Sequence, residues 1–258
     1  MKQQIRLLSD ETWDVLVILD ACRADAFMRI TGQGQVVRSP ANCTPRWCKA
    51  VLPILQKRGV RYVTGQPVVD RTYAHNELPI CSVWRNHWAR FGPENIPSVH
   101  PMSVTACAIE VAQTHVTSPL VVHYIQPHSP YIGTPPLAAA RVSDGRRGPT
   151  HAMSELVRPD LAVASGPLTW ADVRAAYDGN VRLGWQAVKA LVAGLSTLGR
   201  KRRVIVTADH GELLGERGRF GHEAKWSDEE LYRVPWLVMQ TGDETDGVKA
   251  KLEALGYV

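Results

Sequence analysis

The sequence predicts an α/β fold with a mostly parallel central sheet and helices on both faces. Four apolar runs of strand length, residues 15–19, 120–124, 204–207 and 234–239, are rich in Val, Ile and Leu without alternating polar residues, which is typical of buried parallel strands. Helix-like stretches lie between them, and in residues 171–195 apolar side chains recur at three- and four-residue spacing. Strands that alternate with helices in this way predict a doubly wound sheet.

The chain, residues 1–258, is expected to form a single domain with two variable insertions. Residues 67–101 contain several Pro and Trp residues, which leaves open whether they form a lid or a subdomain. Residues 127–167 are rich in Pro and Gly with scattered charges, so we expect a long surface excursion there. Substrate choice would be set by these two segments.

Composition argues against several classes of partner. The net charge of +5 suits a small anionic substrate, but the 30 basic residues are spread along the chain. The dense basic run at residues 200–203 precedes an apolar strand, which favours a solvated turn over a nucleic-acid patch. No apolar run is long enough to span a bilayer. We therefore expect neither a nucleic-acid partner nor a membrane span, and the oligomeric state stays open.

The cysteines and the N-terminus indicate a cytoplasmic protein. Five cysteines are an odd number without close paired spacing, which argues against a disulfide framework or a zinc knuckle. The first ten residues are too polar for a secretory signal. A reducing compartment is therefore expected.

Polar residues follow three of the apolar runs at the point where each strand should end. Asp20 follows the first run, His128 the second, and Asp209 with His210 the third. Ligands of an open α/β sheet bind outside the carboxyl ends of its strands, so these side chains should converge. A single carboxylate after a strand is more often a helix cap. Four such residues at three strand ends make that explanation much weaker.

The convergent residues are suited to a metal ion and a nucleophile. Carboxylate oxygen and imidazole nitrogen together bind a divalent cation, so Asp20, Asp209 and His210 form a partial coordination shell. Thr44 or Cys43, placed before a proline at a predicted helix start, supplies the missing group. Metal contact lowers the pKa of a hydroxyl that is otherwise too weak to attack. Alternatively, Thr44 only caps the helix.

Several motifs resemble the alkaline phosphatase superfamily, and its sulfatase-like branch in particular. Residues 15–25 are similar to the first metal-binding strand of the branch, residues 123–131 to its His-containing substrate motif, and residues 207–218 with 220–222 and 232–235 to its second metal-binding region. Residues 177–182 and 252–258 also look like the branch. Matches span nearly the whole chain, with weak coverage from residue 48 to residue 119.

The resemblance implies an alkaline phosphatase/sulfatase-like fold and a role for each matching residue. The implied ligands of a divalent metal (Mn, Zn, Mg or Ca) are Asp20, Thr44, Asp209 and His210, and phosphatase-like relatives hold a second ion. Thr44 or Cys43 would bridge the metal and attack the ester, while His128 and His222 would contact the transferred group or assist the leaving oxygen. His123 and Lys225 are further candidates for substrate binding. Glu212 and Glu216 either orient ligands or form surface salt bridges.

Departures from the sulfatase pattern favour phosphoryl chemistry. Sulfatases usually carry two adjacent aspartates where this chain has Asp20 and Ala21, and a substrate lysine near the place of His222. They also need an arginine where Trp47 stands, for conversion of the cysteine to formylglycine. The hypothesis is therefore a metal-dependent hydrolase of phosphate or sulfate esters that forms a covalent intermediate, with a phosphate ester favoured. Its rivals are an aryl or alkyl sulfatase, a phosphotransferase or mutase, and a non-catalytic binding protein.

Overall fold

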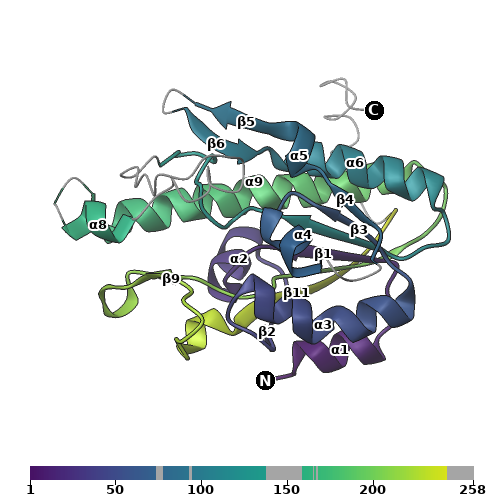
Figure 1. Ribbon diagram of the computed structural model, residues 1–258, viewed down its shortest axis with the longest axis horizontal. Coiled ribbons are helices and arrows are strands. Elements are labelled where there is room, and N and C mark those ends of the chain that lie inside the picture. Colours follow the sequence, from purple (N-terminus) through teal and green to yellow (C-terminus); the bar gives the residue numbers. More distant parts are fainter. Residues whose placement is uncertain (74–77, 93–94, 138–158, 165, 167, 243–258) are drawn as a thin grey trace.

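The computed structural model describes the chain except for residues 74–77, 93–94, 138–158, 165, 167 and 243–258 (Figure 1). Within the described residues, the central sheet has seven strands in the order β2-β11-β8-β1-β7-β3-β4. Their bounds are β1 Val15–Leu19, β2 Gln35–Arg38, β3 Arg61–Thr64, β4 Ile80–Ser82, β7 Leu120–Tyr124, β8 Arg203–Thr207 and β11 Arg233–Gln240. The mostly parallel sheet that the sequence predicts is confirmed.

One expectation about the strands is wrong. Residues 234–239 do form a strand, but β11 pairs antiparallel with both β8 and β2, whereas β8, β1, β7, β3 and β4 run parallel. After the exposed Arg233, residues 234–236 are buried, as in a parallel strand, but residues 237–240 alternate between partly buried and exposed. The continuous apolar pattern of 234–239 reflects burial of the first half, and burial does not determine strand direction.

Helices cover both faces of the sheet (Figure 1). Helices α2, α6 and α9 pack together on one face, and α1, α3 and α4 pack together on the other. The bounds are α1 Gln4–Asp10, α2 Ala24–Thr31, α3 Thr44–Arg58, α4 Pro67–Tyr73, α6 Pro101–Thr114, α8 Pro159–Ala164 and α9 Trp170–Ser196. A continuous apolar core, which includes the fully buried β1 and β7, fills the space between helices and sheet.

The two predicted insertions differ in how much of them is described. Segment 67–101 contributes α4, the edge strand β4, the short helix α5 (Trp84–His87) and an antiparallel pair, β5 (Trp88–Phe91) with β6 (Ile96–Val99). Most of the predicted surface excursion at 127–167 falls on residues 138–158, outside the described residues. Among the described helices, none has the length and apolarity that crossing a membrane requires.

Candidate active site

The ends of β1 and β8 place two carboxylates side by side. Asp20 directly follows β1 and Asp209 lies two residues past β8, and both side chains are completely buried. Oδ1 of Asp209 accepts hydrogen bonds from the backbone N–H of Ala21 at 3.1 Å and of His210 at 2.9 Å. Ala21 has a φ of 58°, in the left-handed region that non-glycine residues seldom adopt. These backbone contacts leave Oδ2 of Asp209 facing the site.

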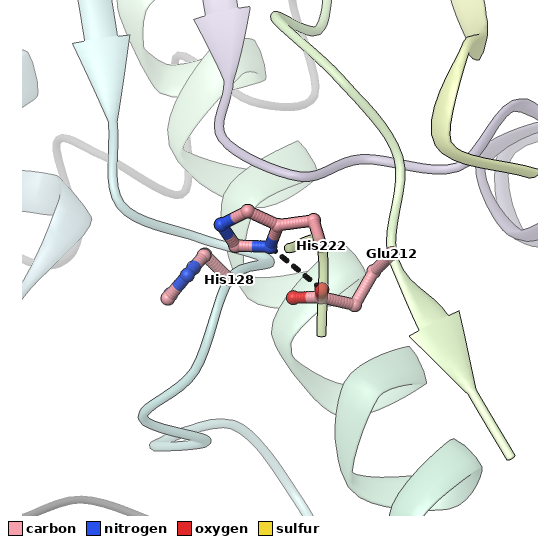
Figure 2. Close-up of side chains that lie close together, drawn as sticks. All are labelled: His128, Glu212 and His222. Carbon is pink, nitrogen blue, oxygen red and sulfur yellow. Dashed lines mark hydrogen bonds and ion pairs between the residues drawn. The ribbon is translucent and has the colours of Figure 1, made fainter. Parts of the chain in front are cut away.

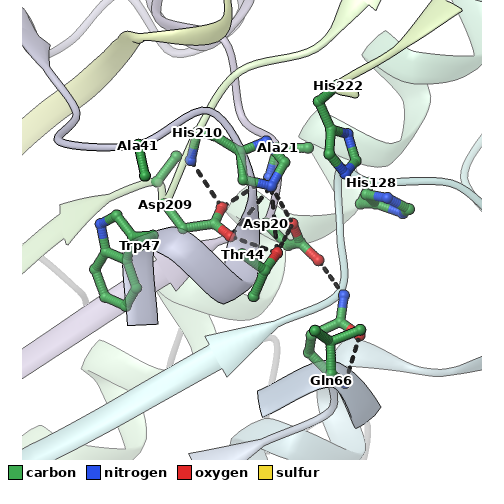
Figure 3. Close-up of polar contacts among 12 residues, drawn as sticks. Asp20, Ala21, Ala41, Thr44, Trp47, Gln66, His128, Asp209, His210 and His222 are labelled. Carbon is green, nitrogen blue, oxygen red and sulfur yellow. Dashed lines mark hydrogen bonds and ion pairs between the residues drawn. The ribbon is translucent and has the colours of Figure 1, made fainter. Parts of the chain in front are cut away.

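Thr44 lies against both carboxylates (Figure 3). Its hydroxyl donates to Oδ2 of Asp209 at 2.8 Å, and its Oγ1 is 3.2 Å from Nε2 of His210 and 3.5 Å from Oδ1 of Asp20. The N-cap of α3 is Cys43, which forms no side-chain capping bond, so the hydroxyl of Thr44 is directed to the site and does not cap the helix. The oxygen therefore lies at a helix N-terminus, which favours anions.

His210 presents its second nitrogen to the same point. Its Nδ1 lies 2.8 Å from the carbonyl of Gly211, and because a carbonyl only accepts, Nδ1 carries the proton. Nε2 then holds a lone pair, 3.3 Å from Oδ2 of Asp209 and 3.5 Å from Oδ1 of Asp20. Burial, together with the nearby His222, holds the pKa of His210 well below its ordinary value. The imidazole is therefore neutral, the form that binds a metal.

These atoms fit a divalent cation. The contacts of Oγ1 of Thr44 and Nε2 of His210 with the carboxylates span 2.8–3.5 Å. Bonds of about 2.0–2.2 Å in a tetrahedral site place neighbouring ligand atoms roughly 3.3–3.6 Å apart. Burial and the neighbouring Asp209 raise the pKa of Asp20 well above its ordinary value, since a second negative charge is costly there. A cation held between the carboxylates removes that repulsion.

Gln66 completes the inner group and has no counterpart in the sequence predictions. Its Nε2 donates to Oδ2 of Asp20, which orients that carboxylate (Figure 3). Gln66 stands two residues past Thr64, the last residue of β3. The same strand-end argument that identified Asp20 identifies Gln66 as well, but the four-residue β3 is too short to recognise from its apolar pattern.

A second group, His128, Glu212 and His222, lies on the outer side of the site (Figure 2). Nδ1 of His222 is 2.8 Å from Oε1 of Glu212. The centroid of the His222 ring lies 4.2 Å from that of the tilted His210 ring and 5.1 Å from that of His128, which it meets edge to face. Burial opposes charge on His222, but the Glu212 carboxylate outweighs it and raises the pKa of His222. Burial lowers the pKa of His128. His222 is therefore the better proton donor of the two.

Helix α9 fixes the position of His128. Nδ2 of Asn180 donates to the carbonyls of His128 at 3.2 Å and of Pro130 at 3.0 Å, and its Oδ1 accepts from the backbone of Gly133 at 2.8 Å. A Cβ on Gly133 would lie 2.4 Å from the backbone of Gly179, so the loop and the helix meet through two glycines. Asn180 belongs to a motif noted in the sequence, but its spacing gave no sign of this role.

Asn42 fixes the loop that carries His222. Its Nδ2 donates to the carbonyls of Glu223 at 3.1 Å, Ala224 at 3.3 Å and Trp226 at 2.8 Å. Asn42 itself is completely buried, next to the start of α3. The nucleophile segment and the His222 loop are therefore held together by one side chain.

The structure brings together six of the residues that the sequence singled out: Asp20, Thr44, His128, Asp209, His210 and His222. Among the described residues, Cys43 Sγ forms no hydrogen bond with them. Glu212 is a buried partner of His222, whereas Glu216 forms a salt bridge with Arg23 at 2.5 Å.

The two further substrate candidates, His123 and Lys225, have very different surroundings. His123 is completely buried on β7, with Nε2 4.0 Å from Oδ2 of Asp209 and Nδ1 2.7 Å from the hydroxyl of Tyr62. Ligand atoms of His123, Asp20 and Asp209 lie within 4.8 Å of one another, so His123 belongs to the buried inner part of the site, and its contact with a substrate stays a prediction. Lys225 is 75% exposed and pairs with Glu223 at 2.8 Å.

Comparison with known families places the chain. The family model described as Sulfatase matches residues 36–254, most of the sequence. The chain belongs to the sulfatase family. This membership confirms the resemblance seen in the sequence, and with it a place in the alkaline phosphatase/sulfatase-like superfamily of enzymes. No curated protein sequence matches the chain.

Solved structures with the same fold include transferases and a sulfatase. The soluble domain of lipooligosaccharide phosphoethanolamine transferase A from Neisseria meningitidis has a TM-score of 0.62 at 16% identity, over 92% of this chain and 80% of that domain. The integral membrane form gives 0.60 at 17% identity, over 94% of this sulfatase-family chain but only 52% of the transferase. BT1596, a 2-O GAG sulfatase, gives 0.52 at 13% identity, over 88% and 64%. Identities this low establish the fold alone.

Proposed function

We propose that this sulfatase-family chain is a metal-dependent hydrolase of phosphate esters that uses Thr44 as its nucleophile. The observation that carries the proposal is the position of Thr44 Oγ1, which lies 2.8 Å from Asp209 Oδ2, 3.2 Å from His210 Nε2 and 3.5 Å from Asp20 Oδ1. The hydroxyl is thus buried among acidic and imidazole side chains at a helix N-terminus, which is the setting expected of an activated nucleophile.

The ligand set of the proposal is Asp20, Thr44, Asp209 and His210. A divalent cation held by these residues supplies positive charge, which favours the ionised hydroxyl and balances charge on the transferred group. The mixture of carboxylate oxygen and imidazole nitrogen suits zinc or another borderline ion. One structural neighbour, the periplasmic domain of EptC from Escherichia coli, was solved as a complex with zinc.

The chain's residues account for each bond change. Oγ1 of Thr44 forms a bond to phosphorus while the bond from phosphorus to the ester oxygen breaks, and the hydroxyl proton leaves along its hydrogen bond to Asp209. His222, whose pKa the Glu212 carboxylate raises against the effect of burial, donates a proton to the departing oxygen. A water molecule then gives a proton to His222, which lost its own in the first step, and the water oxygen forms a bond to phosphorus while the bond from Oγ1 to phosphorus breaks. Oγ1 of Thr44 takes back the proton that left toward Asp209. Burial of the reacting groups, with Thr44 4% exposed, excludes bulk water from the first step.

Two observations favour phosphate over sulfate. Cys43, the residue that a sulfatase would convert to formylglycine, lies at the N-cap of α3 outside the ligand set. Trp47, where the conversion motif requires arginine, is completely buried and donates from Nε1 to Gln4 at 2.8 Å. Trp47 is thus a core residue, and the unmodified hydroxyl of Thr44 is the nucleophile available at the site.

The second candidate function is phosphotransfer. In this reaction an alcohol replaces water as the acceptor of the phosphoryl group. Two of the solved structures that share this fold are phosphoethanolamine transferases, which supports this candidate. The chemistry at Thr44 is the same for both acceptors, so the phosphothreonine is common to them. Product analysis in the presence and absence of alcohols separates the two.

The test is a pair of variants assayed on matched aryl phosphate, phosphodiester and sulfate esters. We expect Thr44→Ala to lower kcat/KM for phosphate esters by at least about 1000-fold, because it removes the attacking atom. Cys43→Ala serves as the matched control and should retain activity, since that side chain is not in the ligand set. Acid quench followed by intact-mass measurement should show a phosphate adduct on the wild type and on Cys43→Ala, but not on Thr44→Ala.

Three outcomes would contradict the proposal. Full activity of the Thr44 variant refutes the nucleophile, and loss of activity in the Cys43 variant alone moves the nucleophile by one residue. Preferential cleavage of sulfate esters makes the protein a sulfatase. Unchanged thermal unfolding of both variants is required for each conclusion.

A further inference from the structure

Two cysteines that are far apart in the sequence meet on the surface beside the edge of the sheet. Sγ of Cys81, in β4, lies 2.8 Å from Sγ of Cys107, in α6, across 26 positions of sequence. Both are partly exposed, whereas Cys22, Cys43 and Cys48 are buried. The spacing of the cysteines gave no sign of this pair, because only the fold brings β4 against α6.

We propose that Cys81 and Cys107 form a redox-sensitive disulfide that ties edge strand β4 to helix α6. This modification site is separate from the ligand set at Thr44 and does not depend on the proposed reaction. The two sulfurs are already within van der Waals contact, and a disulfide with an S–S bond of about 2.0 Å requires them to approach by less than about 1 Å. Small rotations of two partly exposed side chains provide that movement.

An oxidant has access to Cys81. The residue lines a surface cavity of about 210 Å³ together with Arg61 and His115. A guanidinium at this position favours an anionic oxidant, such as the disulfide of a carboxylate-bearing thiol like glutathione. Access through this cavity makes Cys81 the sulfur that attacks first, with Cys107 as the resolving thiol.

The exchange balances in two steps. The Cys81 thiolate attacks one sulfur of the small disulfide, so a mixed disulfide forms at Cys81 and one small thiolate leaves and takes up a proton. Cys107, as its thiolate, attacks Sγ of Cys81 and expels the second small thiolate, which is also protonated. Two protein thiols are oxidised and one small disulfide is reduced to two thiols. Burial and the neighbouring Cys81 raise the pKa of Cys107 to about 12, so the second step should quicken as pH rises.

The link would stabilise a weak part of the sheet. Strand β4 has three residues, and within the described part of the chain it pairs on one side only, through Tyr62, Val63 and Thr64 of β3. Helix α6 packs against β3 and β7, so a bond from β4 to α6 joins the edge to the centre of the fold. Closing this loop also restricts the unfolded chain. The cysteine pair stays reduced where reduced glutathione is abundant, and it forms the disulfide when the ratio of oxidised to reduced glutathione rises.

The experiment compares the intact protein in oxidised and reduced glutathione. After free thiols are blocked and the chain is digested, mass spectrometry should find one peptide pair joined through Cys81 and Cys107 with the loss of two hydrogens. The melting temperature of the oxidised protein should rise by roughly 5–10 °C, and reduction should reverse the rise. Cys81→Ser and Cys107→Ser should each abolish the link and the shift.

A control variant and four possible outcomes test the proposed disulfide. Cys22→Ala removes a buried cysteine and should retain both the link and the shift. Five free thiols after oxidation, a link to a buried cysteine, or a glutathione adduct at Cys81 that never resolves would each overturn the proposal. A rise in melting temperature that persists in Cys107→Ser would do so as well, because it would come from another site.

Discussion

The inner ligand group and the outer histidine group of the candidate site are built in different ways. Asp20, Asp209 and His210 are completely buried and closely follow strands of the sheet. His128 and His222 are partly exposed and lie on loops that are held by Asn180 and Asn42. The sheet therefore determines where the cation and nucleophile lie, while the loops determine which groups meet the rest of the ester.

The electrostatics of the two groups differ as well. In the inner group, buried carboxylates face each other and raise the pKa of Asp20, so the group favours a cation. In the outer group, Glu212 balances His222 and raises its pKa, so charge is already paired there. Removing the negative charge of Asp20 should therefore stabilise the metal-free fold, whereas removing that of Glu212 should destabilise it.

The largest effect is expected in the inner group. Asp20→Asn removes a ligand and a negative charge, so metal affinity measured by calorimetry should fall by more than about 100-fold. Because the folded pKa of Asp20 is raised, its ionisation costs stability: metal-free wild type should lose stability as pH rises above the ordinary carboxyl pKa of about 3.9 and through the folded pKa. The variant should lack this loss and melt higher than wild type at neutral pH in chelator.

Melting curves with and without metal over a range of pH test both predictions for Asp20→Asn: weaker metal binding and a higher melting temperature without metal. A metal-free variant that melts lower than wild type would show that Asp20 stabilises the fold through its bond to Gln66 rather than straining it through Asp209. Equal metal affinity of variant and wild type would remove Asp20 from the ligand set.

An intermediate effect is expected in the outer group. Glu212→Gln removes the carboxylate that raises the pKa of His222, so the pKa should fall and the alkaline limb of kcat should move to lower pH by about one unit. Metal affinity should change much less than in Asp20→Asn. A pH profile identical to that of wild type would show that His222 is not the proton donor, and His222→Gln, which should lose the limb entirely, is the matched comparison.

The contrast between the two groups also explains which parts of the site the sequence could predict. β1 and β7 have the bounds expected from their apolar runs, and β8 begins one residue earlier than expected. The residues that follow these strands in the sequence could therefore be assigned to one edge of the sheet. Gln66 could not, because β3 is short and contains Arg61. Roles that depend on loop geometry, such as those of Asn42 and Asn180, have no periodic pattern to reveal them.

The same limit applies to features made by tertiary contact alone. The direction of β11 depends on how it returns beside β8, and its apolar composition carries no information about that. The contact between Cys81 and Cys107 depends on packing of the edge strand against a helix. The burial of His123 behind Asp209 follows from its register with Ile18 and Thr64 in the sheet. Residue types and strand ends indicate the candidates, and register decides their roles.

The smallest effect is expected at the rim, where two variants of one loop separate positioning from charge. Lys225→Ala removes an exposed cation whose bond to Glu223 is a surface ion pair, so kcat/KM should change by less than about twofold. Asn42→Ala removes the side chain that holds three carbonyls of the same loop, so kcat/KM should fall by roughly tenfold as His222 loses its position. The reverse order of effects would show that Lys225 contacts the substrate, as the sulfatase resemblance implies, and would assign substrate recognition to the charge on the rim.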